Sequence, residues 1–327
     1  MLDERWGEAE QELADGLRGL LEKHGDASVV RAAEAAGDGR SPDLEDRLDD
    51  FGLWDLPADA GVLAAAAWEL GRALAPIPFP ERAALVAVGV GDHVWAEREW
   101  APAVGLDAAF VDPEGRLMGA RLGDSQRSVA GDLVARVQPT GKVLAPIGDA
   151  DRARRLVRLL AAARAVGAAE GALAIGVGYA KERQQFGRPI GAFQAVAHRL
   201  ADAAIAVDGA ALAVRKAAWV SRVEQGGDGA PDSTFAAIAR WAAEDAAEAA
   251  VAATHQVMGG YGFTVEYDCQ LYSRRTRAWR LRLEPVETEL AALARRLLTT
   301  EGRDASAWLW HHERGLDVPR WAAEADA

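Results

Sequence analysis

The chain has 327 residues, 50% of them hydrophobic, with a net charge of −13 and a pI of about 5.0. The hydrophobic content supports a large core and excludes a mainly disordered chain. The negative charge, without any basic patch interleaved with aromatics, excludes a nucleic-acid-binding module. Cys269 is the single cysteine, so an internal disulfide is excluded as well.

The start of the chain lacks the features of a targeting segment. No positively charged start is followed by an apolar run, so no signal peptide is expected. Arg, Glu or Asp interrupts the alanine-rich runs, and no apolar stretch long enough to span a membrane is free of charge. We therefore expect a soluble, cytoplasmic protein that does not interact with membranes.

Residues 1–75 are predicted to form an N-terminal helical domain. Apolar residues recur at helical spacing over 6–21, 44–53 and 62–74. Gly25 is the expected end of the first helix. Two prolines directly after residue 75 end the last helix, because proline cannot continue it.

Residues 76–148 change character and are predicted to form a small, mostly antiparallel β domain. Helical periodicity fades, and turn signals such as the Asp-Pro-Glu-Gly string at 112–115 separate short apolar runs. These runs cover residues 84–90, 108–111, 133–137 and 142–144.

Residues 149–300 return to helical spacing and are predicted to form a C-terminal four-helix bundle. A glycine-rich loop at 225–231 breaks the pattern, after which Asp232 and Ser233 offer N-caps for a helix that runs to Met258. The other three helices are expected over 156–181, 193–223 and 286–298.

Residues 301–327 form a tail that is rich in tryptophan. His311 and His312 lie there, but adjacent histidines on a helix point about 100° apart and seldom hold one metal ion together. We predict no metal site and interpret the tail as a packing or partner-binding surface. Cys269 is expected to be a buried small residue rather than a nucleophile.

A first string of interest, YAKERQQFGRPI, covers residues 179–190. Gly187 and Pro189 end a helix just after Arg183, which places the guanidinium at a turn where it can pair bidentately with a pyrophosphate. Phe186 beside it can pack on a ring system. The alternatives are that the charged run is a solvated helix face and that Phe186 belongs to the core.

A second string, HQVMGGYGFTVEY, covers residues 255–267. Gly259 and Gly260 allow backbone amides to approach a ligand closely, because no side chain intervenes. Gln256, one helical turn earlier, adds an amide donor. The alternative is that these glycines form only a flexible hinge.

The two strings, in this order and on these helices, resemble the C-terminal bundle of acyl-CoA dehydrogenases, and the ELGR string at 69–72 resembles that family's N-terminal helical domain. The resemblance is strong over roughly residues 150–280. It implies a mainly α fold with a small β region: an N-terminal helical domain, a reduced middle β domain and a C-terminal four-helix bundle. It also implies contacts to the adenosine and pyrophosphate end of an FAD that a neighbouring subunit largely binds, made by Arg183, Gln185, Phe186, Gln256, Gly259 and Gly260.

The middle of the chain departs from that family. Family members carry a Thr-Glu-Pro…Gly-Ser-Asp string and a Trp-Ile-Thr-Asn string there, which contact the isoalloxazine ring. Neither string occurs over 76–148, and the surroundings of Trp95 and Trp100 do not match. The resemblance therefore implies a chain that serves a neighbour's flavin and has lost the residues that hold its own.

The position of the catalytic base departs as well. Counting the family's distance from the double glycine leads to Leu283, and Glu284 follows one residue later without the family's Gly-Thr. The alternative base position of some members falls near Val157. Neither Leu283 nor Val157 can accept a proton, so we predict that this chain supplies no base. The opposing interpretation, a rebuilt loop in which Glu284 is the base, stays open. Arg158 matches a family arginine near the active-site mouth and is predicted to contact substrate.

These departures resemble the shortened subunits of hetero-oligomeric acyl-CoA dehydrogenases that bacteria use on steroid side chains. The implied function is that of a non-catalytic oxidoreductase subunit with FAD shared across a subunit interface. Its expected partners are a full-length acyl-CoA dehydrogenase subunit and an acyl-CoA substrate. The alternative is a flavin-free, homo-oligomeric protein that binds acyl groups or small molecules, or a repurposed non-redox enzyme, on the same fold.

Overall fold

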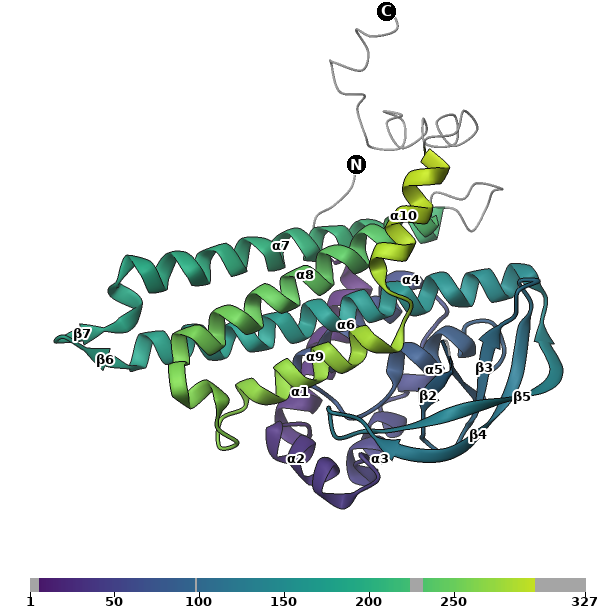
Figure 1. The fold of residues 1–327 in the computed structure, drawn as a ribbon, viewed down its shortest axis with the longest axis horizontal. Helices are drawn as coiled ribbons and strands as arrows, with labels where there is room; N and C mark the ends of the chain where they lie inside the picture. Colours follow the sequence, from purple (N-terminus) through teal and green to yellow (C-terminus); the bar gives the residue numbers. More distant parts are fainter. Residues whose placement is uncertain (1–5, 98, 224–231, 298–327) are drawn as a thin grey trace, which may run out of the picture.

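The computed structural model describes residues 6–97, 99–223 and 232–297 (Figure 1). Long antiparallel helices form a bundle, and the N-terminal helices and one small sheet lie along one side of it. The glycine-rich loop at 225–231 and the tail at 301–327, with its tryptophans and histidines, lie outside the described residues. The prediction of a mainly α fold with a small β region is confirmed.

The N-terminal part contains one more helix than the sequence analysis predicted. The helix over 27–36 was missed although Asp26 caps it, accepting hydrogen bonds from the backbone N–H groups of Ser28 and Val29. The first helix ends before Gly25, as predicted, where the Gly25 N–H donates to Leu21 O at 2.8 Å. The helical elements are α1 (Glu8–His24), α2 (Ala27–Ala36), α3 (Pro42–Asp50), η1 (Leu53–Asp55) and α4 (Ala60–Arg72).

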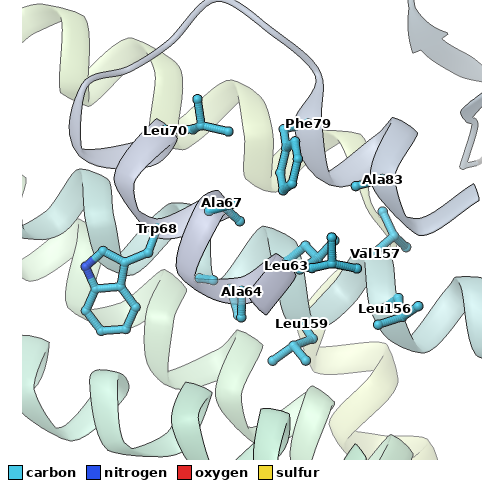
Figure 2. Close-up of a cluster of buried hydrophobic side chains, with 14 of the residues drawn as sticks. Leu63, Ala64, Ala67, Trp68, Leu70, Phe79, Ala83, Leu156, Val157 and Leu159 are labelled. Atoms are coloured by element: carbon cyan, nitrogen blue, oxygen red, sulfur yellow. The ribbon is translucent and has the colours of Figure 1, made fainter. Parts of the chain in front are cut away.

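The apolar run at 84–90, which was grouped with the strands, lies partly in helix α5 (Phe79–Val86), so this prediction was wrong. A short apolar run fits a buried strand and a buried helix equally well, and tertiary packing decides between them. Phe79 and Ala83 of α5 are buried against α4 and α6 (Figure 2).

The middle region forms a five-stranded sheet, in the order β1-β3-β4-β5-β2. The predicted runs at 108–111, 133–137 and 142–144 lie in β3 and β5, and the other three strands were not predicted. Only the β1–β3 pair is parallel, so the expectation of a mostly antiparallel sheet is confirmed. Register shifts along the β4–β5 hairpin mark irregular pairing there. The strands are β1 (His93–Trp95), β2 (Trp100–Pro102), β3 (Asp107–Val111), β4 (Leu117–Arg127) and β5 (Leu133–Ala145).

The first of the C-terminal helices is longer than predicted, and the described residues contain one more α-helix than predicted. Helix α9 was missed because five arginines interrupt its apolar spacing, yet it packs against α6 and α8. The described elements are α6 (Ile147–Glu182), α7 (Gln194–Val223), α8 (Asp232–Met258), η4 (Gly259–Phe263), α9 (Cys269–Arg282) and α10 (Val286–Leu297).

Helix α6 is the central element of the core. Its length and composition would suit a membrane span, but 56% of its apolar window is buried, and it packs against α4, α7 and α8. Figure 2 shows Val157 and Leu159 of α6 beside Leu63 of α4. The helix crossing is close: a Cβ on Gly167 would overlap the carbonyl oxygen of Trp68. This crossing fixes α6, and therefore the position at which its C-terminal end leaves the bundle.

Candidate functional site

The first string surrounds the C-terminal end of α6, at one tip of the bundle (Figure 1). Arg183 is the C-cap of α6 and donates its backbone N–H to Tyr179 O at 2.9 Å. The chain then forms a short hairpin of β6 (Gln184–Gln185) and β7 (Arg188–Pro189), and η2 (Ile190–Ala192) leads into α7. The prediction that Arg183 lies at a turn is confirmed.

Phe186 occupies the tip of that hairpin and is 91% exposed. Phe186 and Gly187 have φ angles of 53° and 76°, the left-handed pair that a two-residue hairpin requires. Such a conformation is uncommon for a bulky residue. The ring meets Phe193 edge-on, with 6.0 Å between the centroids. Phe186 is therefore not a core residue of this chain, and its ring is available to a partner or a ligand.

The second string follows the C-terminal end of α8 and continues as η4. A Cβ on Gly259 or Gly260 would meet no atom within 4 Å, so the backbone there is open to a ligand. Gly259 has a φ of 61°, which a residue with a side chain rarely adopts. Gln256 is exposed one turn earlier. The glycine backbone and an amide side chain thus share one open surface.

The fold brings the two strings together. The guanidinium carbon of Arg183 lies 6.0 Å from the centre of the Tyr261 ring. The ring centres of Tyr179, on α6, and Tyr261 are 6.5 Å apart. No carboxylate pairs with Arg183 among the described residues. A free guanidinium, an open glycine backbone and exposed aromatic rings fit the phosphate and adenosine end of FAD. The strings that would hold its isoalloxazine ring are missing from this chain.

A groove of about 620 Å³ begins at this surface and continues between α8 and α9, with α6 as its floor. The sequence analysis did not predict it. Gln256 and Gly259 line one end and Leu283 lines the other. We call it the α8–α9 groove. It connects the surface that fits the nucleotide to the position counted for the base.

The counted base position is a buried leucine. Leu283 follows the last residue of α9 in an extended conformation, with a ψ of 165°. The chain bends at Leu283, and Glu284, the next residue, is half-buried. The Glu284 carbonyl accepts a hydrogen bond from Arg240 at 2.6 Å, and its N–H donates to Glu97 at 3.3 Å. Val157, the alternative position, is fully buried.

The space between α5, α6 and α9 is filled with charged side chains. Glu81 of α5 accepts two hydrogen bonds from Arg164, at 3.0 and 3.1 Å, and also pairs with Arg282. Burial by itself raises the pKa of Glu81, but the two guanidiniums bring it below its ordinary value. Trp279 lies under Arg164, 4.4 Å from its guanidinium carbon. The cavity lined by Trp279 and Arg282 on this side measures about 30 Å³, roughly one water.

Arg158, the predicted substrate contact, lies in a network of ion pairs. Its guanidinium contacts Glu97 at 2.9 Å and Glu289 at 2.5 Å. Glu289 also pairs with Arg240, at 2.7 Å. Arg158 therefore ties α6 to α10 and to the segment after β1, and its charge is already compensated by carboxylates.

Arg274 of α9 pairs with Glu34 of α2 at 2.8 Å, so it connects these two helices. Cys269 is buried, as expected, and burial raises the pKa of its thiol to about 12.

Sequence reasoning missed three residues that line the α8–α9 groove: His255, Phe263 and Arg277. Phe263 was part of the quoted string but carried no assignment. Arg277 could not be singled out, because it is one of five arginines on α9 and the ion-pair partners of the other four lie elsewhere in the chain. Only the folded arrangement shows which of them is paired.

The fold is that of the acyl-CoA dehydrogenases, and the chain belongs to this family. Residues 153–298 match the family described as "Acyl-CoA dehydrogenase, C-terminal domain". The chain is 33% identical to the acyl-CoA dehydrogenase IpdE2 of Mycobacterium tuberculosis over 312 residues, which cover 82% of this chain and 91% of that protein.

Two solved structures show the same fold. A chain of the ChsE4-ChsE5 complex from Mycobacterium tuberculosis has a TM-score of 0.76 and 21% identity, covering 91% of this chain and 99% of that one. A chain of the Tcur3481-Tcur3483 steroid ACAD has a TM-score of 0.77 and 23% identity, covering 89% and 98%. At these identities the likeness establishes the fold alone.

Proposed function

We propose that the chain is a non-catalytic subunit of a cytoplasmic, FAD-dependent acyl-CoA dehydrogenase. The complex desaturates an acyl-CoA thioester, of lipid or steroid origin, between its α and β carbons. This chain contacts the adenosine and pyrophosphate end of FAD. A full-length partner subunit contacts the ring and supplies the base.

One observation carries the proposal: the residues that fit the nucleotide end lie together on open surface, whereas the base position is a buried leucine. Arg183, Gly259 and Gly260 can all be reached from outside the chain. Beyond Leu283, toward α5, the space is occupied by Glu81 and Arg164, each 4% exposed. The chain thus offers a cofactor surface to another subunit without a substrate site of its own.

Bound FAD supplies a hydride acceptor for the β-carbon of the substrate. Removal of the α-proton requires a positioned carboxylate, and we assign that role to the partner. Arg183 binds the pyrophosphate by charge-assisted hydrogen bonds. Phe186, exposed on a short hairpin, covers the nucleotide and excludes water from it.

The comparisons support a partner subunit. One similar structure is a complex of two different proteins, ChsE4 and ChsE5, and another is the paired Tcur3481-Tcur3483 steroid ACAD. The chain also lacks the strings for the isoalloxazine ring, so FAD needs a second chain to hold that end. These two observations support a hetero-oligomer.

The test is flavin retention in the assembly formed with a full-length acyl-CoA dehydrogenase. Arg183→Ala is expected to weaken retention on dilution by about tenfold or more, because it removes a charge-assisted pair of about 1.5–3 kcal/mol. Arg121→Ala, an exposed arginine on β4, is the matched control and should retain flavin normally. Circular dichroism should show unchanged helical content in both variants. Equal flavin retention by Arg183→Ala and the parent would show that Arg183 is a solvated surface residue that does not contact FAD.

A second candidate is the flavin-free, homo-oligomeric binding protein or non-redox enzyme. The α8–α9 groove favours it, since about 620 Å³ within one chain is large enough for a small molecule. The absorbance spectrum separates the two candidates. A protein that stays colourless when mixed with FAD and a full-length partner supports the second candidate, and flavin absorbance supports the first.

A further inference from the structure

The α8–α9 groove is a long, narrow slot between one face of each helix. On α8 its lining runs from Arg240 to Gln256, which is 16 residues or about 24 Å at 1.5 Å per residue. Over that length, a volume of about 620 Å³ corresponds to a mean cross-section of about 26 Å². An α-helix with its side chains is about 10–12 Å across and needs about 80–110 Å². The groove is therefore too narrow for a helix of a partner protein and wide enough for one extended chain.

The deeper part of the groove is apolar and is lined by small side chains. Ala161 and Ala165 of α6 form its floor, Ala247 and Val251 of α8 form one wall, and Leu283 lies at the far end. A hydrocarbon chain placed there would be removed from water along its length, and the transfer of apolar surface out of water is favourable.

The hydroxyl groups of the α9 wall use their hydrogen-bond donors within α9. The Ser273 hydroxyl donates to Gln270 O at 3.1 Å, and the Thr276 hydroxyl donates to Tyr272 O at 2.8 Å. The backbone groups of both walls are bonded inside their own helices. An extended peptide carries one N–H and one C=O group per residue, and these groups need partners when they are buried. The groove does not supply such partners, so it suits a chain that has no polar groups along its length.

The charged residues that line the groove are three arginines and two glutamates, which leaves a net charge of +1. Arg240 and Arg280 both pair with Glu244, and Arg280 also pairs with Glu248. Arg277 is exposed, lines the groove, and makes no ion pair with any residue that the structure describes. In a chain with a net charge of −13, this guanidinium is available to an anionic group of a ligand.

The position of Arg277 separates the charged part of the groove from the apolar part. Burial, and more weakly the charge of Arg277, lower the pKa of His255 at the outer end of the groove, so its imidazole is neutral at pH 7. His255 therefore does not change the net charge of the lining. A ligand whose anionic group contacts Arg277 would have the apolar part, toward Leu283, for the rest of its length.

We propose that the α8–α9 groove binds a long, unbranched carboxylic acid of the fatty-acid class, with its carboxylate on Arg277 and its hydrocarbon chain along the apolar floor toward Leu283. This site goes beyond the proposed function, because its ligand is neither the flavin nor the thioester substrate. Gln256 and Gly259, at the outer end of the groove, stay free to contact FAD.

Charge decides between a free fatty acid and its CoA thioester. One carboxylate balances the net charge of +1 in the lining, whereas CoA carries several phosphate charges that the described lining does not balance. The same hydrocarbon chain could come from either source, so the experiment compares both.

The experiment measures binding of cis-parinaric acid, a fluorescent unbranched fatty acid, to the purified full chain, with palmitate as competitor and both below their micellar concentrations. Arg277→Gln is expected to weaken binding by about tenfold or more, the scale of a charge-assisted hydrogen bond, and Arg277→Lys to restore part of the loss. Ala252 is exposed and lines the groove, so Ala252→Phe should fill the slot and also weaken binding by about tenfold or more. The matched controls, Arg121→Gln on β4 and Ala201→Phe on the exposed side of α7, should bind like the parent. Thermal unfolding checks that each variant is folded.

Methyl palmitate separates the contribution of the carboxylate from that of the chain. The ester keeps the hydrocarbon chain and loses the charge, so it should compete less well than palmitate for the parent. Arg277→Gln should weaken the acid and leave the ester unchanged, because the two changes remove the same interaction. A purely structural role of Arg277 would weaken the acid and the ester alike.

Three results would overturn the inference. The first is the absence of saturable binding to the folded parent, or unchanged binding in both folded Arg277→Gln and Ala252→Phe. The second is equal competition by palmitate and its methyl ester, which also decides the matter should Arg277→Gln fail to fold. The third is that palmitoyl-CoA competes better than palmitate and depends on Arg277, since the thioester would then be the ligand.

The proposed function is tested separately, by flavin retention in the assembly that carries Arg183→Ala. Loss of flavin from that variant, with no parinaric acid bound by the parent, overturns the inference and leaves the proposed function standing. Normal flavin retention by Arg183→Ala, with Arg277-dependent binding of parinaric acid, supports the inference and counts against the proposed function.

Discussion

The two sides of helix α9 differ in how their charges are compensated. Toward α5 and α6, Glu81 lies between Arg164 and Arg282, and the space is filled. Toward α8 there is a groove of about 620 Å³, and Arg277 lies at its wall without a carboxylate partner in the part of the chain that the structure describes. Trp279 lines the cavities on both sides and separates them. The closed side stabilises the chain, and the open side is the one that can receive something from another molecule.

The difference follows from the cost of burying charge. A buried carboxylate is tolerated only when its partners compensate the lost hydration, as Arg164 and Arg282 do for Glu81. An exposed guanidinium such as Arg277 keeps its water and needs no partner in the isolated chain. The filled side is therefore sensitive to losing one member, whereas the exposed Arg277 on the groove side can be substituted at little cost in stability.

The largest expected effect is on the filled side. Arg164→Leu leaves Glu81 with one guanidinium and is expected to lower the free energy of unfolding by about 3–5 kcal/mol, measured by urea denaturation. The matched control is Arg136→Leu, whose pair with Glu99 is exposed on both sides and contributes at most about 1 kcal/mol. A loss no larger in Arg164→Leu than in the control would contradict the interpretation of this side as a compensated buried cluster.

The ion pair between Glu81 and Arg164 also makes the free energy of unfolding depend on pH, in a direction that can be predicted. The pKa of Glu81 is lowered in the folded chain, so its contribution to stability is present above the unfolded pKa of about 4.3 and is lost as pH falls through the folded value. Part of the acid destabilisation of the parent should therefore be missing in Arg164→Leu. A parallel pH dependence of the two proteins below about pH 4 would show that the pair contributes nothing to it.

A smaller effect is expected from a cysteine placed in the groove. Ser273 lines the groove, whereas Cys269, one helical turn earlier, is buried with a thiol pKa of about 12. Thiolates are the reactive species, so Ser273→Cys should react with a thiol reagent at pH 8 at least about a hundredfold faster than native Cys269. Stoichiometric labelling is read by mass spectrometry. Equal rates in the parent and the variant would mean that the groove is closed in solution.

The sequence predicted the structure correctly where the deciding residues lie within one helix or directly after it. The periodicity of α6, α7 and α8 predicted these helices, and the turn chemistry at Gly187 and Pro189 placed Arg183 at the end of α6. The resemblance to the family then supplied the function that we propose. These predictions depend on residues close together in the chain, which is why they could be made.

The sequence was insufficient where distant residues decide. The sequence around Arg277 does not show that Arg274 forms an ion pair with Glu34 of α2, or that Arg282 forms one with Glu81 of α5. The groove forms where α9 packs beside α8, and the arginines of α9 interrupt the apolar spacing that would have predicted this helix. The assignments of Gln185, Phe186, Gln256, Gly259 and Gly260 to FAD stay predictions, and the flavin-retention experiments address the surface to which they belong.

The smallest expected effect tests the central claim most directly: that the chemistry takes place on the partner. The measurement is acyl-CoA-dependent dye reduction by the assembled complex carrying Glu284→Gln, with flavin content determined in the same sample. We expect the parent rate, because the counted base position is the buried Leu283 and the backbone of Glu284 is held by Arg240 and Glu97. A loss of about a hundredfold or more, the scale of removing a general base, with flavin still bound, would show that Glu284 is the base and that this chain is catalytic.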